Sequence, residues 1–296
     1  MHAACWLLTV GILSSLSSRA EPASSTAPRE LSSVTGVEAD RLPAGIDLRG
    51  SFRRWGLTER RQGSRGTCSA FTVAGALEFA VAKRQGRSPR LSVEFLNWAA
   101  NKTGSDTADG GFFSDLWKGF VVHGICVEEA MPYAAKFDPA AQPSAEALAE
   151  AKTRLPLGLQ LHWIKEWNVN TGLTDDHLTS LKRTLADGWP VCGGFRWPSQ
   201  AKWVDGVLQM CATNAVYDGH SILLVGYRDD TRQPGGGLFV FRNTAGDGRD
   251  GSMPYAYAKT FMNDAAWVDY GSRDAPLTAA RSRAGGANSP RRLFAP

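Results

Sequence analysis

The cysteine best placed to do chemistry in this sequence is Cys68, which stands where a loop passes into a helix. It lies within the stretch Gln62–Phe71, and no proline interrupts the residues that follow until Gly86, the expected helix stop. Unpaired backbone N–H groups in the first turn of a helix favour an anion, so a thiolate at Cys68 would be stabilised there. Gln62 offers a neutral hydrogen-bond donor nearby. A lone cysteine on a helix is more often a core residue, so catalysis requires a base elsewhere in the chain.

A base and a group to orient it are found at His220 and Asn243. The runs 219–227 and 237–242 are apolar and rich in β-formers, and a polar, glycine-rich segment joins them as in a long hairpin. His220 opens the first run and Asn243 closes the second, so the hairpin register predicts that their side chains meet at one end of a sheet. A nucleophilic cysteine needs a histidine to take its proton and a third group to hold the imidazole. Cys68, His220 and Asn243 form such a set.

The elements that must position these residues separate into a helical first half and a β-rich second half. Capping signals and apolar periodicity predict helices over 69–84, 91–100, 113–123, 144–154 and 174–187. Strands are expected over 189–195, 219–227 and 237–242. Helices followed by strands indicate an α+β fold with a cleft between two lobes, where ligand sites tend to lie.

Four motifs, in this order along the chain, resemble those of the papain-like cysteine peptidases. The stretch 62–71 (QGSRGTCSAF) resembles the block around that family's nucleophile, and 42–49 (LPAGIDLR) resembles its mature N-terminus. The stretch 219–227 (GHSILLVGY) is similar to the family's histidine strand, and 242–246 (RNTAG) to its asparagine block. The resemblance implies a papain-like two-lobe fold, in which the active-site cleft lies between an N-terminal helical lobe and a C-terminal antiparallel β lobe.

The resemblance gives a role to each of four polar residues. It implies that Cys68 is the nucleophile, His220 the general base and acid, Asn243 the group that orients the imidazole, and Gln62 an oxyanion donor. A thiolate and an imidazolium stabilise one another, so we expect an ionised nucleophile at neutral pH. The implied reaction is hydrolysis of peptide bonds through a thioester acyl-enzyme, with no cofactor and no metal.

Three glycines match positions that contact substrate in the family. Gly110 and Gly111 correspond to its paired glycines, which take the substrate backbone, and Gly219 borders the pocket that reads substrate side chains. The resemblance therefore implies a peptide or protein substrate.

The sequence also departs from the family pattern beside the catalytic residues. Arg65 and Ser69 replace the usual cysteine and tryptophan, so the disulfide that normally begins in this loop cannot form. Thr244 and Ala245 replace serine and tryptophan, which removes the aromatic residue that shields the histidine–asparagine pair from water. The alternative is therefore a catalytically weakened papain-like scaffold that binds peptide or protein in its cleft.

The remaining cysteines of the domain are Cys126, Cys192 and Cys211, an odd number once Cys68 is reserved as a nucleophile. Cys192 with Cys211 is one candidate bridge, although connectivity cannot be deduced from sequence. No pair has C-x-x-C or C-x-x-H spacing, so a structural zinc site is not indicated.

The two ends of the chain differ in composition from the domain between them. Residues 1–20 carry an apolar run too short to cross a membrane, followed by small residues, which resembles a signal peptide and predicts a secreted or otherwise exported protein. Residues 21–41 are expected to form a linker, shorter than the long inhibitory propeptide of the family. We expect the peptidase domain over 42–271 and a disordered, Arg-rich tail over 272–296.

Composition excludes several other classes of protein. The chain has 296 residues, a net charge of +4 and 43% hydrophobic residues, as is ordinary for a soluble, enzyme-sized protein. Lysine and arginine are spread along the chain, so binding to nucleic acid is not indicated. We expect a monomer without a membrane span.

Overall fold

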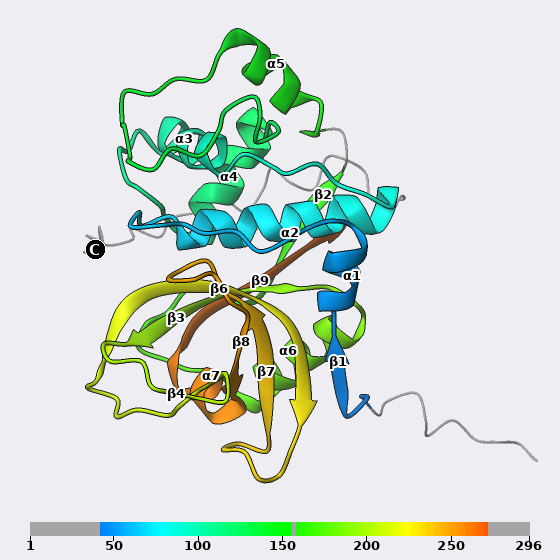
Figure 1. The fold of residues 1–296 in the computed structure, drawn as a ribbon, viewed down its shortest axis with the longest axis vertical. Helices are drawn as coiled ribbons and strands as arrows, with labels where there is room; N and C mark the ends of the chain where they lie inside the picture. Colours follow the sequence, from blue (N-terminus) through cyan, green and yellow to red (C-terminus); the bar gives the residue numbers. More distant parts are fainter. Residues whose placement is uncertain (1–41, 156–157, 272–296) are drawn as a thin grey trace, which may run out of the picture. The chain divides into compact units, whose positions relative to one another are not determined.

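The helix that begins at Cys68, α2 (Cys68–Gln85), runs through the middle of the molecule, with helices on one side and a sheet on the other (Figure 1). The computed structural model describes residues 42–155 and 158–271. The expected signal peptide, linker and tail (1–20, 21–41 and 272–296) lie outside these residues. Most of α2 is buried, because it packs against α3 and α4 on one side and against β3, β6 and β9 on the other.

The first part of the domain is helical, as expected. Its helices are α1 (Arg49–Arg54), α2, α3 (Val93–Gly104), α4 (Phe113–His123) and α5 (Ala145–Lys152). The predicted boundary signals are confirmed: the Ser92 hydroxyl caps α3 by accepting the Phe95 N–H at 2.9 Å. Gly86 ends α2 in the left-handed region, at φ 76°.

The second part of the domain is built around one twisted sheet. Within the described residues the sheet has nine strands in the order β2-β9-β3-β6-β7-β8-β5-β4, with β1 beside β6, and every pair is antiparallel except β5 with β8. The strands are β1 (Gly45–Asp47), β2 (Leu159–Lys165), β3 (Val191–Pro198), β4 (Trp203–Val204), β5 (Val207–Leu208), β6 (Val216–Asp229), β7 (Gly237–Arg242), β8 (Gly251–Pro254) and β9 (Met262–Tyr270). Two helices complete this part, α6 (Asp175–Ala186) and α7 (Tyr255–Phe261). The predicted α+β class, a helical N-terminal part followed by an antiparallel sheet, is confirmed.

The hairpin predicted to carry the histidine and the asparagine is the β6–β7 pair. Its strands pair from Asp229↔Gly237 to Leu223↔Arg242. His220 lies within β6, before the residues that pair with β7, and it pairs with Phe195 of β3. Asn243 directly follows β7. This register brings the two side chains to the same end of the sheet, as the sequence predicts.

None of the helices in the described ranges combines the length and the apolar character needed to cross a lipid bilayer.

Candidate active site

Cys68 is the first residue of α2 and is 4% exposed. Its N-cap, Thr67, makes no side-chain capping hydrogen bond, so the first-turn N–H groups are not covered by that side chain. The Cys68 thiol donates a hydrogen bond to the Gly219 carbonyl oxygen, with an Sγ–O distance of 3.9 Å. The sulfur therefore faces the β6 segment that carries His220.

The imidazole of His220 is held by Asn243. His220 Nε2 lies 2.9 Å from Asn243 Oδ1, and this oxygen also accepts the backbone N–H groups of Thr244 at 2.9 Å and Ala245 at 3.2 Å. Two N–H donors identify the oxygen side of the amide, so His220 Nε2 carries the proton. In the neutral ring, Nδ1 is then left with a lone pair that can accept a proton.

Burial controls the ionisation of both groups. It raises the pKa of the Cys68 thiol, an effect that hydrogen bonds with Ser221 oppose. Burial lowers the pKa of His220 to about 4, although the Asn243 hydrogen bond acts in the opposite direction. The structure therefore favours a neutral thiol beside a neutral imidazole, rather than the ionised nucleophile expected from the sequence.

An aromatic side chain covers His220. Trp197 of β3 packs edge-on against the imidazole, with 4.6 Å between ring centroids and 74° between ring planes. Trp197 is 7% exposed and His220 is 5% exposed. Trp197 therefore covers the His220 ring although Ala245 carries no aromatic side chain, whereas Asn243 itself is only half-buried.

The side-chain amide of Gln62 is held at both ends. Its Oε1 accepts a hydrogen bond from the Thr244 hydroxyl at 2.8 Å, and its Nε2 donates to the Arg65 carbonyl oxygen at 2.9 Å. An amide nitrogen has two N–H groups, so one is left for another acceptor. A donor whose orientation is fixed in advance is what stabilisation of an oxyanion requires.

Two of the three predicted substrate-contacting glycines share a pocket with the histidine. Gly111 and Gly219 line a small pocket together with His220, Phe112 and Asp264. The structure therefore brings Gly111 and Gly219 to one pocket with His220, whereas neither Cys68 nor Gly110 is among the residues that line it.

Gly111 and Gly110 already have partners within the protein. The Gly111 N–H donates to the Ser69 hydroxyl at 3.2 Å. Gly110 has φ +100° and donates its N–H to Asn97 Oδ1 at 2.9 Å, and a Cβ there would collide with the Gly66 carbonyl oxygen. Gly110 therefore packs against the loop that leads to Cys68.

The four cysteines of the described residues are all free thiols. The candidate bridge between Cys192 and Cys211 is therefore wrong. Cys192 is buried in β3 and donates a hydrogen bond to the Thr72 carbonyl oxygen at 3.7 Å. Across the described ranges, no group of three or more histidine, cysteine, aspartate or glutamate side chains is arranged to hold a metal ion.

Comparison with known protein families matches residues 42–258 to the papain family of cysteine proteases. The chain belongs to this family. A curated relative, an uncharacterized peptidase C1-like protein of Acanthamoeba polyphaga mimivirus, is 26% identical over 217 residues, which are 68% of this chain. The match spans 65% of the length of that relative.

Solved structures show the same fold. The chain is similar to xylellain, a cysteine protease from Xylella fastidiosa, with 26% identity over 77% of this chain and 87% of that one, and a TM-score of 0.59. A second likeness is to digestive procathepsin L 3 of the Tenebrio molitor larval midgut, with 21% identity over 78% of this chain and 71% of that one, and a TM-score of 0.57. This second likeness concerns the fold alone.

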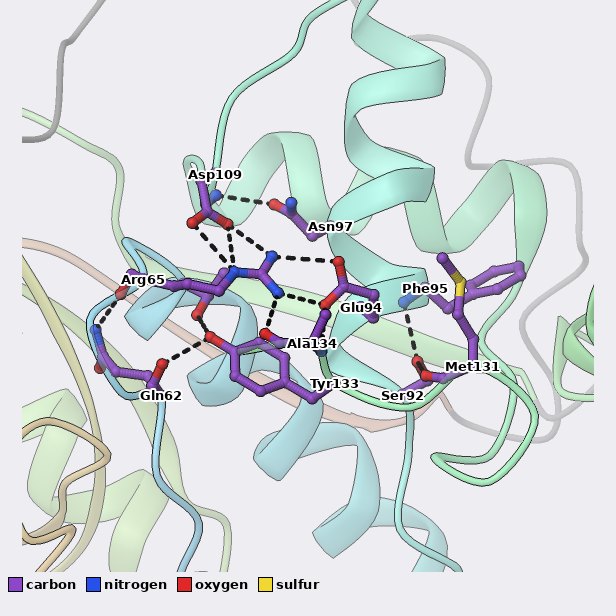
Figure 2. Close-up of polar contacts among 12 residues, drawn as sticks. Gln62, Arg65, Ser92, Glu94, Phe95, Asn97, Asp109, Met131, Tyr133 and Ala134 are labelled. Carbon is purple, nitrogen blue, oxygen red and sulfur yellow. Dashed lines mark hydrogen bonds and ion pairs between the residues drawn. The ribbon is translucent and has the colours of Figure 1, made fainter. Parts of the chain in front are cut away.

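Sequence reasoning missed two residues that support the site. Trp197 follows the predicted strand 189–195, and only the pairing of β3 with β6 places it against His220. Arg65 was read as a departure from the family, but its guanidinium is buried among carboxylates next to the catalytic loop (Figure 2). In the sequence, Arg65 is visible only as one of the departures from the family motif, and the residue type alone does not reveal its partners.

Proposed function

We propose that this protein hydrolyses peptide bonds with Cys68 as nucleophile, His220 as general base and acid, Asn243 as orienting residue and Gln62 as oxyanion donor. The observation that supports this most is the 2.9 Å hydrogen bond from His220 to Asn243, beside a thiol at the start of α2. Such a set can activate a weak nucleophile and hold its base in one tautomer.

In the first half of the proposed reaction, His220 Nδ1 accepts the Cys68 thiol proton while the sulfur attacks the carbonyl carbon of a peptide bond. The carbonyl oxygen becomes negative and accepts hydrogen bonds from the Cys68 backbone N–H and from the remaining side-chain N–H of Gln62. The tetrahedral intermediate then collapses: the C–N bond breaks, the imidazolium gives its proton to the leaving amine, and a thioester remains on Cys68.

In the second half, a water molecule attacks the thioester carbon and gives its proton to His220. The C–S bond breaks, the proton returns to the sulfur, and a carboxylic acid product leaves. Trp197 limits access of bulk water to the imidazole throughout, since it covers one edge of the ring.

The central experiment compares wild type with Cys68→Ala on a mixed peptide library. The wild type should cleave peptides, and the variant should lose this activity because no other group replaces the sulfur. Cys126→Ala is the matched control: Cys126 is also buried, but it packs in a separate apolar cluster with Phe95 and Ala147, so its removal should leave turnover per folded molecule unchanged. Undiminished turnover by Cys68→Ala would refute the proposal.

The second candidate is a weakened scaffold that binds peptides in the same pocket. The pKa shifts of Cys68 and His220 favour it, because both oppose a thiolate at rest. An epoxysuccinyl thiol reagent separates the candidates: stoichiometric labelling at Cys68 supports the protease, whereas peptide binding without labelling or cleavage supports the scaffold.

We also propose that the protein is exported, on the basis of the signal-like residues 1–20. Mass spectrometry of the expressed protein tests this: a chain that begins at Glu21 supports export, whereas retention of Met1 in all molecules contradicts it.

A further inference from the structure

The guanidinium of Arg65 lies at the centre of a buried polar cluster (Figure 2). Its Nη1 lies 2.5 Å from Glu94 Oε2, and its Nη2 lies 2.8 Å from Asp109 Oδ1. The Ala134 carbonyl oxygen accepts a third hydrogen bond, at 2.8 Å. The Arg65 side chain is only 3% exposed.

The partners of Arg65 belong to elements that are distant in the sequence. Glu94 lies in the first turn of α3, and Asp109 directly precedes Gly110 and Gly111. The guanidinium therefore joins the loop 62–67, which leads to Cys68, to the segment 109–111, which contributes to the pocket. The packing of Gly110 against the Gly66 carbonyl shows that these two segments lie face to face.

The same cluster holds Gln62. The Arg65 carbonyl accepts the Gln62 side-chain amide at 2.9 Å, and the Tyr133 hydroxyl donates to the Gln62 backbone oxygen at 2.8 Å. The Tyr133 ring lies under the guanidinium, 4.5 Å from its central carbon, and its hydroxyl is 2.6 Å from the Thr67 hydroxyl. The loop is thus held at Gln62, Arg65 and Thr67.

Only an arginine meets the requirements of this position. Burial lowers the pKa of Arg65, but the hydrogen bonds with Asp109 and Glu94 outweigh that effect and raise the pKa, so the group stays charged. The planar guanidinium donates hydrogen bonds to both carboxylates and to the Ala134 carbonyl oxygen at the same time, which a lysine ammonium cannot reproduce.

We propose that Arg65 is a positioning residue, whose guanidinium clamps the loop 62–67 to the segment 109–111 and thereby fixes the orientation of the Gln62 amide. This clamp consists of hydrogen bonds and ion pairs rather than a disulfide, so a reductant does not break it. This inference rests on the proposed peptide hydrolysis, in which Gln62 is the oxyanion donor.

The test variant is Arg65→Lys, which keeps the charge and removes the fork. Arg60→Lys is the matched control, since Arg60 also pairs with two carboxylates, Glu78 at 3.2 Å and Glu128 at 2.6 Å, and its side chain is 16% exposed. Its guanidinium makes no contact with Gln62 or Asp109 among the hydrogen bonds and ion pairs of the described residues. Both variants should lose stability, but only Arg65→Lys should lose kcat.

A double-mutant cycle with Gln62→Ala shows whether Arg65 acts through the amide. Gln62→Ala should lower kcat by about 10²–10³-fold, the usual cost of a missing oxyanion donor, and Arg65→Lys by about 10-fold or more through misplacement of that donor. In the Gln62→Ala background, Arg65→Lys should cost less than about twofold, because the interaction it supports is already absent. A full additional loss in that background would overturn the proposal.

Hydrogen–deuterium exchange gives a second readout that needs no turnover. In Arg65→Lys, amides of both 62–67 and 109–111 should exchange about tenfold faster or more, whereas Arg60→Lys leaves both segments protected. Unchanged protection, or faster exchange in one segment only, would overturn the clamp. A wild type without peptidase activity would refute the proposed hydrolysis, and the exchange result would still support or overturn the clamp.

Discussion

The neutral state of His220 predicts how the stability of the protein depends on pH. The pKa of His220 is lowered to about 4 by burial, from an ordinary value of 6.5, and this difference corresponds to about 3 kcal/mol. Above pH 6.5 the side chain is neutral in both the folded and unfolded chains. Between pH 6.5 and pH 4 the unfolded chain binds a proton that the folded chain does not, so the free energy of unfolding falls as the pH falls. Below about pH 4 the loss is complete.

Two measurements check this prediction. Urea unfolding between pH 7 and pH 4 should show the loss in wild type, and a variant His220→Gln should lack about 3 kcal/mol of it, because glutamine does not titrate. An NMR titration of the imidazole should place its midpoint near pH 4.

The variant Cys68→Ala separates a neutral pair from an ion pair. If the pair is neutral, removal of the thiol leaves the low pKa of His220 almost unchanged, because burial causes it. If the resting enzyme holds a thiolate and an imidazolium, the wild-type pKa of His220 lies well above 6.5 and falls when Cys68 is removed. That result, or iodoacetamide alkylation of Cys68 at a constant rate between pH 5 and pH 8, would refute the assignment of a neutral pair.

Four further variants test the surroundings of the site. Trp197→Ala should raise the pKa of His220 towards its ordinary value and cost about 3–5 kcal/mol of stability, since it opens a cavity beside the ring; an unchanged NMR titration of His220 would show that the indole does not shield it. Gly110→Ala should lower the free energy of unfolding in urea by about 2 kcal/mol or more, because Gly110 has φ +100° and the Gly66 carbonyl oxygen leaves no room for a Cβ. Gly111→Ala is the control: a Cβ there meets open space, so it should cost less than about 1 kcal/mol. Glu78→Gln should cost about 3 kcal/mol of stability, because it breaks buried ion pairs with two arginines, but should leave the turnover of the folded fraction within about twofold.

The sequence predicted the hairpin and both of its chemical residues because their signals are local. Two apolar runs joined by a glycine-rich segment predict the β6–β7 hairpin, which brings His220 and Asn243 to the same end of the sheet. The α4 boundaries (Phe113–His123) were predicted as observed, since a glycine stop follows the helix directly.

Features that depend on contacts distant in the sequence were not predictable in the same way. The strand β9 (Met262–Tyr270) pairs with β3, but its residues carry polar groups among apolar ones and lack a hairpin signal. The cover over His220 comes from Trp197, whose position depends on the alignment of β3 with β6. The ionisation state also depends on burial, which a motif does not report.

The departures from the family pattern have different physical consequences. Arg65 joins the loop 62–67 to Asp109 by an ion pair, the Thr244 hydroxyl binds Gln62, and Trp197 packs against His220 where Ala245 offers no aromatic ring.

Ser69 is different, because its hydroxyl accepts a hydrogen bond from the Gly111 N–H, and the family resemblance implies that Gly111 contacts the substrate backbone. We therefore expect a bound peptide to replace the Ser69 hydroxyl or to bind without that N–H, and we expect either outcome to weaken ground-state binding more than it affects the reacting atoms. In the proposed reaction, the departure with the largest expected effect therefore lies on the substrate side, where we expect it to act on KM rather than on kcat.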